Sequence, residues 1–456
     1  MSDSPDTPTE VLELDAQGNE VPLAERSEDE LAALAEQMQM GDGARYGGYN
    51  YVAEPAEGYD TPGIWTCHYA GTRSGYAHVG HALSWALADH LELPTQLVPH
   101  RSIRGIDLAD VPKDREEHVT RWLKGAVGLG RALIVTLPPP PAAQMNGYGR
   151  TRVVCYATHE LNRVSPSCAE ICNPGPEEGG FAKIWVKSPF AMRAFIAGGV
   201  REERLRLVTP PLIGGPWRVP QHAPKSGTFR FGMLGTWIER KGFDDLLRAY
   251  YGAFSRADDV VLEIKTSPLN EYETVSQTEE ICVAAAKRAR DELGIHHEER
   301  ARVVFKVGSA DTDQEVIDWL AGLDCFANSS YGEGLGVPQI YALAAGVPMV
   351  TTAFGAVGEL VETIDESVGG VHQLVPHHEE RISRDMLRVS RMYDPAQRWG
   401  CYEPQAFGAA MRRAFEAPRR SPATAAYVRE RFSFDTCAPD IQEALAELVD
   451  LQEFAL

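Results

Sequence analysis

The sequence lacks any hydrophobic run that approaches the roughly 18 residues of a membrane-spanning helix. Its first residues, M-S-D-S-P-D-T-P, also lack the basic and apolar regions of a secretory signal. We therefore expect a cytoplasmic protein. Cysteine is limited to eight scattered positions, several of them in apolar strand-like runs, as is typical of reduced core cysteines. Cys168 and Cys172 have the spacing of half a metal site, but no second Cys or His pair stands nearby, so no bound metal is expected.

Positive charge is also scarce, and the formal net charge is −21. Residues 1–60 hold fifteen acids and two arginines, a net charge of −13, whereas the remaining 396 residues carry only −8. This balance disfavours strong binding of nucleic acid, which depends on neutralised phosphates. We expect the first 60 residues to be mostly disordered, apart from a short helix at 27–35, where Ser27 and Glu30 form a capping box. A Gly/Tyr-rich linker is expected at 41–51.

From about residue 60 on, strand-like and helix-like segments alternate in two series, which a Pro- and Gly-rich stretch separates. A chain of 456 residues favours two domains, and the alternation predicts mostly parallel sheets covered on both faces. The strands expected are 64–69, 96–99, 132–137, 152–158, 183–187 and 205–209 in the first series, and 229–234, 260–265, 302–307, 325–327 and 349–351 in the second.

Proline predicts two interruptions of helical structure. Residues 138–141, all proline, are expected to exclude a helix, and the helical segment 424–451 is expected to break before Pro439. Residues 363–420 give only a mixed pattern of helix and loop.

The most informative stretch is S-S-Y-G-E-G-L-G-V-P at 329–338, followed by A-G-V-P at 345–348. It lies between an apolar strand and a helix-like run, so its glycines expose backbone N–H groups at a helix N-terminus, where anions bind. Glu333 adds one fixed acid, a combination that suits a phosphorylated sugar. The stretch resembles the string E-G-F-G-L-P-x-x-E-A-x-A-x-G-x-P of nucleotide-sugar-dependent glycosyltransferases of the GT-B fold, with Tyr341 where the second Glu belongs.

A second motif follows the first strand of the second series, G-T-W-I-E-R-K-G at 235–242. It resembles the G-R-L-x-x-x-K-G of the same family, whose Arg and Lys grip the donor diphosphate. Lys241 matches the Lys, and Thr236 stands in the Arg position. Arg240 or Lys265 is expected to supply part of the missing charge. The alternative is that Lys241 is a solvated lysine at a helix start.

The resemblance implies that Glu333 contacts the donor sugar together with the backbone amides of Gly334, Leu335 and Gly336. It also places Tyr341 where the second Glu would bind the ribose hydroxyls. A phenol donates one hydrogen bond but cannot accept two from a diol as a carboxylate does. Either the ribose is held differently, or the nucleotide is unusual, or activity is reduced. Glu359 matches a further recurring acid of the family, or is an ordinary acid at a helix start.

The first series carries two weaker motifs. The loop G-T-R-S-G-Y-A at 71–77 resembles the glycine-rich loop that faces the donor phosphates and the acceptor, through Ser74, Gly75 and Tyr76. His159 and Glu160 follow a strand and precede a W-V-x-S-x-F pattern at 185–190 that is similar to one of a family subgroup. Either side chain could orient an acceptor hydroxyl or take its proton. The alternative is that His159 and Glu160 are a structural polar pair at the start of a loop.

The resemblance implies a GT-B protein with two Rossmann-like domains that face each other across a cleft. The expected limits are an acidic extension (1–60), an acceptor domain (61–210), a linker (211–228), a donor domain (229–423) and a C-terminal helix that crosses back to the first domain (424–456). The implied reaction transfers a sugar from a UDP- or GDP-sugar to an unidentified acceptor, with retention and without a required metal. Lys241 would stabilise the departing diphosphate, which itself takes the acceptor proton.

Two alternatives stay open. One is a nucleotide-sugar-binding protein of the same fold without turnover, for which Thr236 and Tyr341 are the evidence. The other is an enzyme that glycosylates a modified nucleic-acid base, in a groove that five arginines would line: Arg73, Arg101, Arg104, Arg150 and Arg163. Homo-oligomerisation is compatible with either.

Overall fold

The computed structural model describes residues 62–72, 74–100, 108, 111–124, 127, 129–146, 151–220, 227–268, 273–308, 310, 312–388, 392–417 and 420–454. All of these residues belong to one compact unit of the chain. The disordered extension, the helix at 27–35 and the linker at 41–51 expected from the sequence lie outside the described residues.

The first half of the described chain forms a six-stranded parallel sheet in the order β2-β1-β3-β4-β5-β6. Its middle strands read as nearly continuous apolar runs, as strands buried on both faces do. Trp185 and Tyr156 are among its largest fully buried side chains. The strands are β1 (Pro62–Cys67), β2 (Thr95–Leu97), β3 (Leu129–Val135), β4 (Arg152–Ala157), β5 (Lys183–Val186) and β6 (Leu205–Leu207).

The second half forms another six-stranded parallel sheet, in the order β12-β11-β10-β7-β8-β9. Phe229, Phe231 and Phe326 are completely buried in it. The strands are β7 (Phe229–Leu234), β8 (Val260–Thr266), β9 (Arg302–Val307), β10 (Cys325–Asn328), β11 (Met349–Thr352) and β12 (Gln373–Val375). Every strand predicted from the sequence is present, and β12 is an addition.

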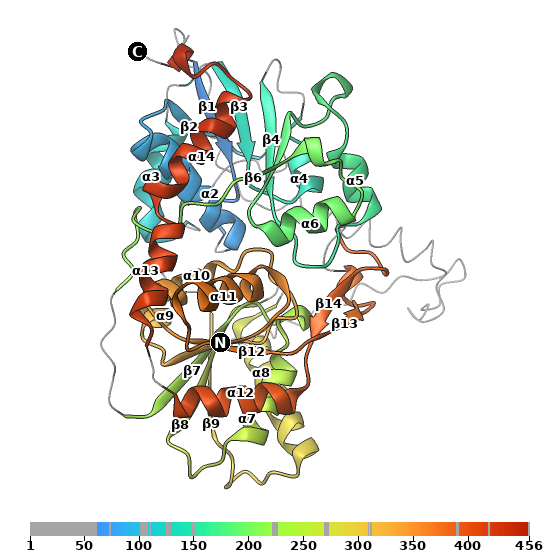
Figure 1. Ribbon diagram of the computed structural model, residues 1–456, viewed down its shortest axis with the longest axis vertical. Helices are drawn as coiled ribbons and strands as arrows, with labels where there is room; N and C mark the ends of the chain where they lie inside the picture. Colours follow the sequence, from blue (N-terminus) through green and yellow to red (C-terminus); the bar gives the residue numbers. More distant parts are fainter. Residues whose placement is uncertain are drawn as a thin grey trace, which may run out of the picture. The chain divides into compact units, whose positions relative to one another are not determined.

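Helices connect the strands and cover the sheets (Figure 1). In α7, the buried residues Phe243, Leu246, Leu247 and Tyr250 recur at helical spacing and give the helix one apolar face. The helices are α2 (Gly75–Trp85), α3 (Lys113–Leu123), α4 (Pro139–Ala143), α5 (Pro166–Cys172), α6 (Pro189–Ala197), α7 (Phe243–Ala253), α8 (Val275–Leu293), α9 (Asp313–Ala321), α10 (Val337–Ala344), α11 (Gly355–Val368), α12 (Pro404–Glu416), α13 (Pro422–Arg431) and α14 (Phe434–Ala446). A π-helical turn, η2 (Ala86–His90), extends α2.

Both sheets reverse their strand order, the first between β1 and β3 and the second between β7 and β10. In open parallel sheets, ligands bind at the carboxyl ends of the strands beside such a reversal. The loops in these places are those after β1, β7 and β10, which carry the three glycine-rich motifs of the sequence.

The C-terminal helices contact both halves (Figure 1). α13 packs against α10 and α11, and α14 packs against η2. Phe434 at the start of α14 meets the Trp85 ring edge-on with a centroid distance of 4.8 Å. Arg206 on β6 forms ion pairs with Asp440 and other acids of α14, at 3.2 Å from Asp440. The chain thus ends on the half in which the first sheet lies.

Two predictions from proline are wrong. Pro439 lies inside α14, and the helix break falls earlier, at the Ser433 cap. One missing backbone hydrogen bond is outweighed by that cap and by a buried face that includes Ile441 and Leu445. The prolines from Pro139 on open α4, because the first N–H groups of a helix have no intrahelical acceptor to lose.

A short antiparallel hairpin, β13 (His378–Arg381) and β14 (Arg398–Cys401), was not predicted from the sequence. It contacts the loop after β4, where the Asn162 backbone N–H donates to the Arg398 carbonyl over 3.1 Å. Arg398 returns a backbone hydrogen bond to the Asn162 side chain at 2.9 Å. The hairpin therefore ties the second half of the chain to the first.

The eight cysteines are free, and all but the half-buried Cys401 are buried, as expected of reduced core cysteines. In the part of the chain that the structure describes, no helix is long and apolar enough to span a membrane. Among the same residues, no three His, Cys, Asp or Glu side chains form a group that could hold a metal ion.

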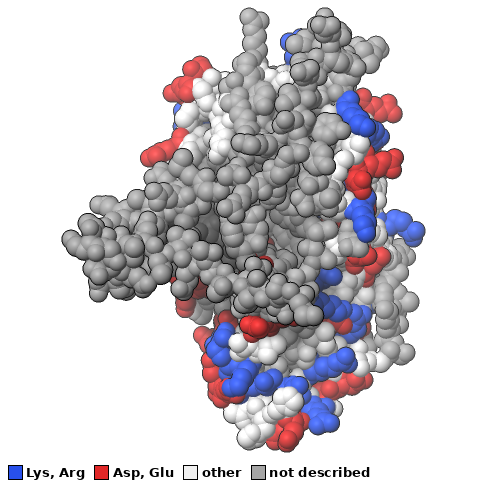
Figure 2. Space-filling model, turned by 180° about the vertical axis from the view of Figure 1, so that it is seen from behind, with Lys and Arg blue, Asp and Glu red and all other residues white. Residues whose placement is uncertain are grey.

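The distribution of charge on the surface is relevant to the nucleic-acid-binding groove considered from the sequence. Four of its five arginines, Arg73, Arg101, Arg104 and Arg150, lie outside the described residues. The fifth, Arg163, lies 3.5 Å from the Asp394 carboxylate. On the face drawn in Figure 2, basic and acidic side chains lie beside one another over the described surface. This mixture does not favour a phosphate-binding groove on that part of the face.

Candidate functional site

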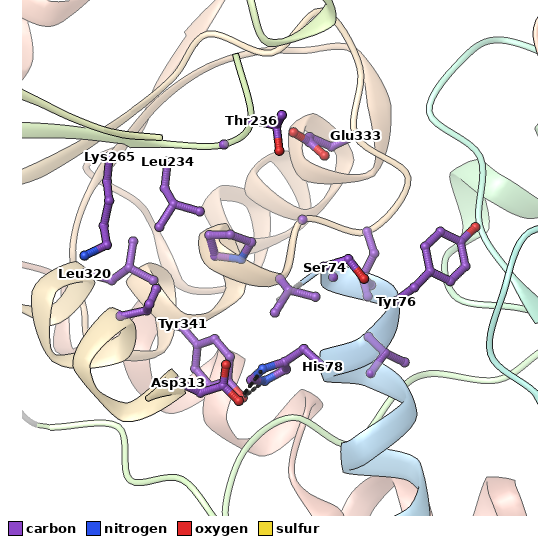
Figure 3. A pocket seen from close by; sticks show the side chains of 18 of the residues that line it. Ser74, Tyr76, His78, Leu234, Thr236, Lys265, Asp313, Leu320, Glu333 and Tyr341 are labelled. Carbon is purple, nitrogen blue, oxygen red and sulfur yellow. Dashed lines mark hydrogen bonds and ion pairs between the residues drawn. The ribbon is translucent and has the colours of Figure 1, made fainter. Parts of the chain in front are cut away.

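One cavity of about 390 Å³ lies between the carboxyl ends of the two sheets, within the size range of small-ligand sites. Its lining includes all the site residues predicted from the sequence except His159 and Glu359: Ser74, Gly75, Tyr76, Glu160, Thr236, Arg240, Lys241, Lys265, Glu333, Gly334, Leu335, Gly336 and Tyr341. Residues from three motifs that together span more than 250 positions of the sequence thus share one cavity (Figure 3).

Glu333 is the central acid of the cavity. Its Oε1 accepts from Lys241 Nζ over 2.5 Å and from Ser330 Oγ over 2.6 Å. Arg240 Nη1 lies 3.5 Å from the other carboxylate oxygen. Burial alone would raise the pKa of Glu333, but the charges of Lys241 and Arg240 overcome it and hold that pKa at about 2. The carboxylate is therefore ionised and held in one position by two cations.

The loops after β7 and β10 fit together through close backbone contacts. The Tyr331 N–H donates to the Arg240 carbonyl over 2.8 Å, and Ser329 Oγ donates to the Lys241 carbonyl over 2.7 Å. Gly242 has a φ of 63°, and a Cβ there would lie 2.3 Å from the Ser329 carbonyl oxygen. Only glycine accommodates both the conformation and the approach. The K-G of the second motif thus positions Lys241 against the Glu333 loop.

Two helix N-termini open on this cavity. Ser74 caps α2 by accepting from the Ala77 N–H over 3.2 Å, and Gly336, with a φ of 84°, precedes the first turn of α10. A Cβ on Gly75 would lie 3.9 Å from the Val337 side chain, so the two first turns are close neighbours. Each leaves backbone N–H groups without intrahelical acceptors and carries a partial positive charge. Together they form a site suited to an anion.

The wall from the first sheet carries Lys187, which sequence reasoning missed. It directly follows β5, is 3% exposed, and lines the cavity. Its Nζ lies 3.8 Å from the centre of the Tyr76 ring, a cation–π contact. The Tyr76 hydroxyl is fixed in turn, since it donates to the Thr158 carbonyl and accepts from the Thr158 N–H, each over 3.1 Å.

Burial lowers the pKa of Lys187 to about 7. Within the described residues, no carboxylate lies within ion-pair distance of its amine. The neighbouring Ser188 donates from Oγ to the Gly334 carbonyl over 2.6 Å, which links the first-sheet wall to the Glu333 loop. The W-V-x-S-x-F pattern was the only sequence signal at this position.

The remaining predicted residues divide into those at the cavity and those away from it. Glu160 lines the cavity and lies 3.9 Å from Arg240, whereas His159 is fully buried beside it. The His159 Nε2 contacts the Arg163 carbonyl at 2.6 Å, a structural position. Glu359 lies in α11 and pairs with Arg193, and it is not part of the cavity lining.

The hydroxyl of Tyr341 lies in a network of polar side chains from four elements. Its hydroxyl lies 2.7 Å from His78 Nε2 and donates to the Leu212 carbonyl over 3.0 Å. Arg115 on α3 binds both oxygens of Asp313, with Nε at 2.5 Å and Nη2 at 2.9 Å. No motif pointed to these partners, which lie far apart in the sequence.

Comparisons with known proteins agree with this architecture. Residues 228–391 match the family model described as Glycosyl transferases group 1, and this segment carries both Lys241 and Glu333. No curated protein sequence is significantly similar to the chain. The resemblance stated from the sequence is therefore confirmed for residues 228–391.

Solved structures with the same fold include HepE from Anabaena in complex with UDP and glucose, at 15% identity and a TM-score of 0.56, covering 85% of this chain and all of that one. Sucrose-phosphate synthase from Thermosynechococcus elongatus is 13% identical, with a TM-score of 0.55, and covers 85% of this chain and 99% of that one. WaaG, a glycosyltransferase involved in lipopolysaccharide biosynthesis, is 13% identical, with a TM-score of 0.52, and covers 84% and 99%. The chain has the GT-B fold of glycosyltransferases, and together with the family match this supports a sugar-transferring enzyme.

Proposed function

We propose that this protein transfers a sugar from a nucleoside-diphosphate sugar to an acceptor hydroxyl, with retention of the anomeric configuration. The observation that carries the proposal is the convergence of two helix N-termini on the cavity that holds the Lys241–Glu333 pair. Amide groups and fixed cations are what a departing diphosphate requires, and they stabilise charge best where they are held in advance. The donor we propose is a UDP-sugar, supported by the UDP and UDP-glucose bound to HepE.

Each part of the donor would meet a different group. The first-turn amides of α2 and α10, with Lys241 and Arg240, would hold the diphosphate. Glu333 would accept hydrogen bonds from the sugar hydroxyls. The acceptor would approach along the first-sheet wall, where Glu160 could orient its hydroxyl. It would attack on the side that the diphosphate leaves, and a diphosphate oxygen would take its proton. We propose domains at 61–210 and 229–423, joined by a linker at 211–228 and closed by the segment 424–456.

The direct test is an assay of transfer and donor hydrolysis with a panel of UDP- and GDP-sugars and a broad panel of acceptors. Turnover with at least one donor supports the proposal, and NMR of the product reports whether the anomeric configuration is kept. Tight donor binding without turnover across a broad acceptor panel would favour the binding protein instead. This alternative rests on Thr236 and Tyr341, the two departures from the family motifs.

Chelation of divalent metals is expected to leave the transfer rate unchanged. Lys241, Arg240 and the helix N-termini supply the positive charge that a metal would otherwise provide. The measurement is the initial rate with and without excess EDTA, with and without added Mg²⁺ or Mn²⁺. A rate that disappears with EDTA and returns with one of these ions would show that the charges described here are insufficient.

The lowered pKa of Lys187 leads us to expect that nucleotide binding depends on pH. Its pKa of about 7 means that the amine is charged below this pH and loses its charge above it. If Lys187 meets a phosphate oxygen, UDP affinity should fall as pH rises from 7 to 8.5, by up to about tenfold per pH unit. Titration calorimetry at several pH values measures the slope.

The control is Lys187→Met, which should bind UDP less tightly at pH 6.5 and show no such slope. An unchanged slope would assign the titration to another group.

The same variant should unfold at a higher temperature at pH 7. A pKa lowered from the ordinary 10.5 of lysine costs stability below pH 7, and this cost disappears as pH rises from 7 to 10.5.

A further inference from the structure

The helix α9 presents one face to the cavity. Asp313, Val316, Ile317 and Leu320 line it, at the spacing that places residues on one side of a helix. The polar residue stands at the N-terminal end and the apolar residues along the next two turns. Figure 3 shows Leu320 near Leu234 and Lys265, and Asp313 beside His78 and Tyr341. An apolar slot that ends in a carboxylate matches a nucleoside, which has a flat base and a ribose with two neighbouring hydroxyls.

The hydroxyl of Tyr341 is already committed within the protein. It donates its proton to the Leu212 carbonyl over 3.0 Å, so it accepts from His78 Nε2 at 2.7 Å. The other ring nitrogen, Nδ1, lies 3.3 Å from Arg115 Nη2 and 3.4 Å from Asp313 Oδ2, so the His78 ring is held between Tyr341 and the Arg115–Asp313 pair. Trp217 stacks on the His78 ring at 4.0 Å and Tyr341 is 2% exposed. Tyr341 is thus a structural residue that joins the linker, α2 and α10.

Asp313 has the hydrogen-bonding capacity that Tyr341 lacks. Its carboxylate lines the cavity, and its side chain is 12% exposed. Arg115, which is fully buried, binds one lone pair on each oxygen, and His78 Nδ1 lies 3.4 Å from Oδ2, whereas a carboxylate offers about four lone pairs. The charge of Arg115 holds the pKa of Asp313 far below its usual range although burial opposes this. The acid is therefore ionised, fixed in direction, and able to accept further hydrogen bonds.

Asp114 holds the start of α9 in place. Its carboxylate accepts from the backbone N–H groups of Asp313 and Gln314, over 3.1 and 3.0 Å, and from Trp217 Nε1 over 3.1 Å. The consecutive residues Asp114 and Arg115 therefore position both the backbone and the side chain of Asp313 from the half of the chain that holds the first sheet. This arrangement fixes the carboxylate before a ligand arrives.

We propose that Asp313 accepts hydrogen bonds from the 2′- and 3′-hydroxyls of the donor ribose, with the base against Val316 and Leu320. This inference rests on the proposed function. Asp313 on α9 would thus do the work of the second acid of the family motif, whose place on α10 is taken by Tyr341. Both side chains contact His78. Tyr341 then has no role in ribose recognition, and its presence does not imply lost activity.

The test compares the affinities of UDP and 2′-deoxy-UDP by titration calorimetry. The wild type should bind UDP about tenfold more tightly, the size expected for a hydrogen bond to a charged group. In Asp313→Asn the ratio of the affinities for UDP and 2′-deoxy-UDP should fall close to one. In Tyr341→Phe it should be unchanged. Because the readout is a ratio within one protein, a general loss of affinity does not imitate the result.

A second variant guards against misfolding of Asp313→Asn, which leaves the buried Arg115 charge unpaired. Asp313→Asn with Arg115→Gln removes both charges together, and should also lose the preference for UDP. The inference is overturned if the wild type has no preference, if either Asp313 variant keeps it, or if Tyr341→Phe abolishes it. Failure of UDP and GDP alike to bind the wild type would instead contradict the proposed function itself.

Discussion

Replacing Lys241 with methionine is expected to weaken binding of a nucleoside diphosphate by roughly 10- to 100-fold, the range of a hydrogen bond to a charged group. Lys241 is held at one place, by Glu333 at its amine and by Ser329 at its carbonyl, so its charge is positioned before a ligand arrives. Transfer should fall further than binding, because charge on the leaving diphosphate increases in the transition state. Calorimetry with UDP and a transfer assay measure the two effects.

Lys287→Met is the matched control for this prediction. Lys287 lies on α8, is exposed, and pairs with Asp291 over 2.6 Å in solvent. Its loss should change neither binding nor transfer, since exposed ion pairs contribute little. If Lys241→Met binds UDP as the wild type does, the assignment of the diphosphate to this loop is wrong.

Replacing Glu333 with glutamine is expected to have opposite effects on binding and on chemistry. Transfer should fall by roughly 10²- to 10³-fold, the cost of removing one preorganised polar group from an active site. UDP without its sugar should bind as tightly as before or more tightly. The carboxylate occupies Lys241 and faces Arg240, so its removal frees two cations for the phosphates.

The measurement compares the dissociation constants of UDP and of the identified UDP-sugar with the transfer rate. Glu366→Gln, at an exposed position of α11, is the control for the loss of one negative charge. A parallel loss of UDP affinity and transfer would mean that Glu333 stabilises the loop rather than contacts the sugar. In that case the stability of the variant should fall too, which a thermal melt detects.

The glycine-rich motifs could be predicted because their information is local. The K-G at 241–242 and the glycines around Glu333 fix backbone conformations next to strand ends, so spacing alone indicates a loop and its chemistry. Alternation of apolar runs likewise predicted every strand of both sheets except β12. The cavity between these loops followed from topology, since strand ends at a reversal of order share one edge.

The rest depends on contacts between distant segments, which no local pattern encodes. Tyr341 was recognised as a departure from the family string, but its partners His78 and Leu212 come from α2 and the segment after β6. Asp313 belongs to no motif, and its partner Arg115 lies on α3, 198 positions away in the sequence. The hairpin of β13 and β14 is short and charged, and lacks the apolar alternation that identifies strands.

Binding of UDP, UMP and uridine to the wild type and to Lys241→Met tests the central claim most directly. If two helix N-termini and Lys241 hold a diphosphate, UDP should bind the wild type at least about tenfold more tightly than UMP, which corresponds to about 1.4 kcal/mol. Uridine should bind most weakly, and Lys241→Met should bring UDP close to UMP. Equal binding of UDP and uridine, or a preference for UDP that survives in Lys241→Met, would contradict the account.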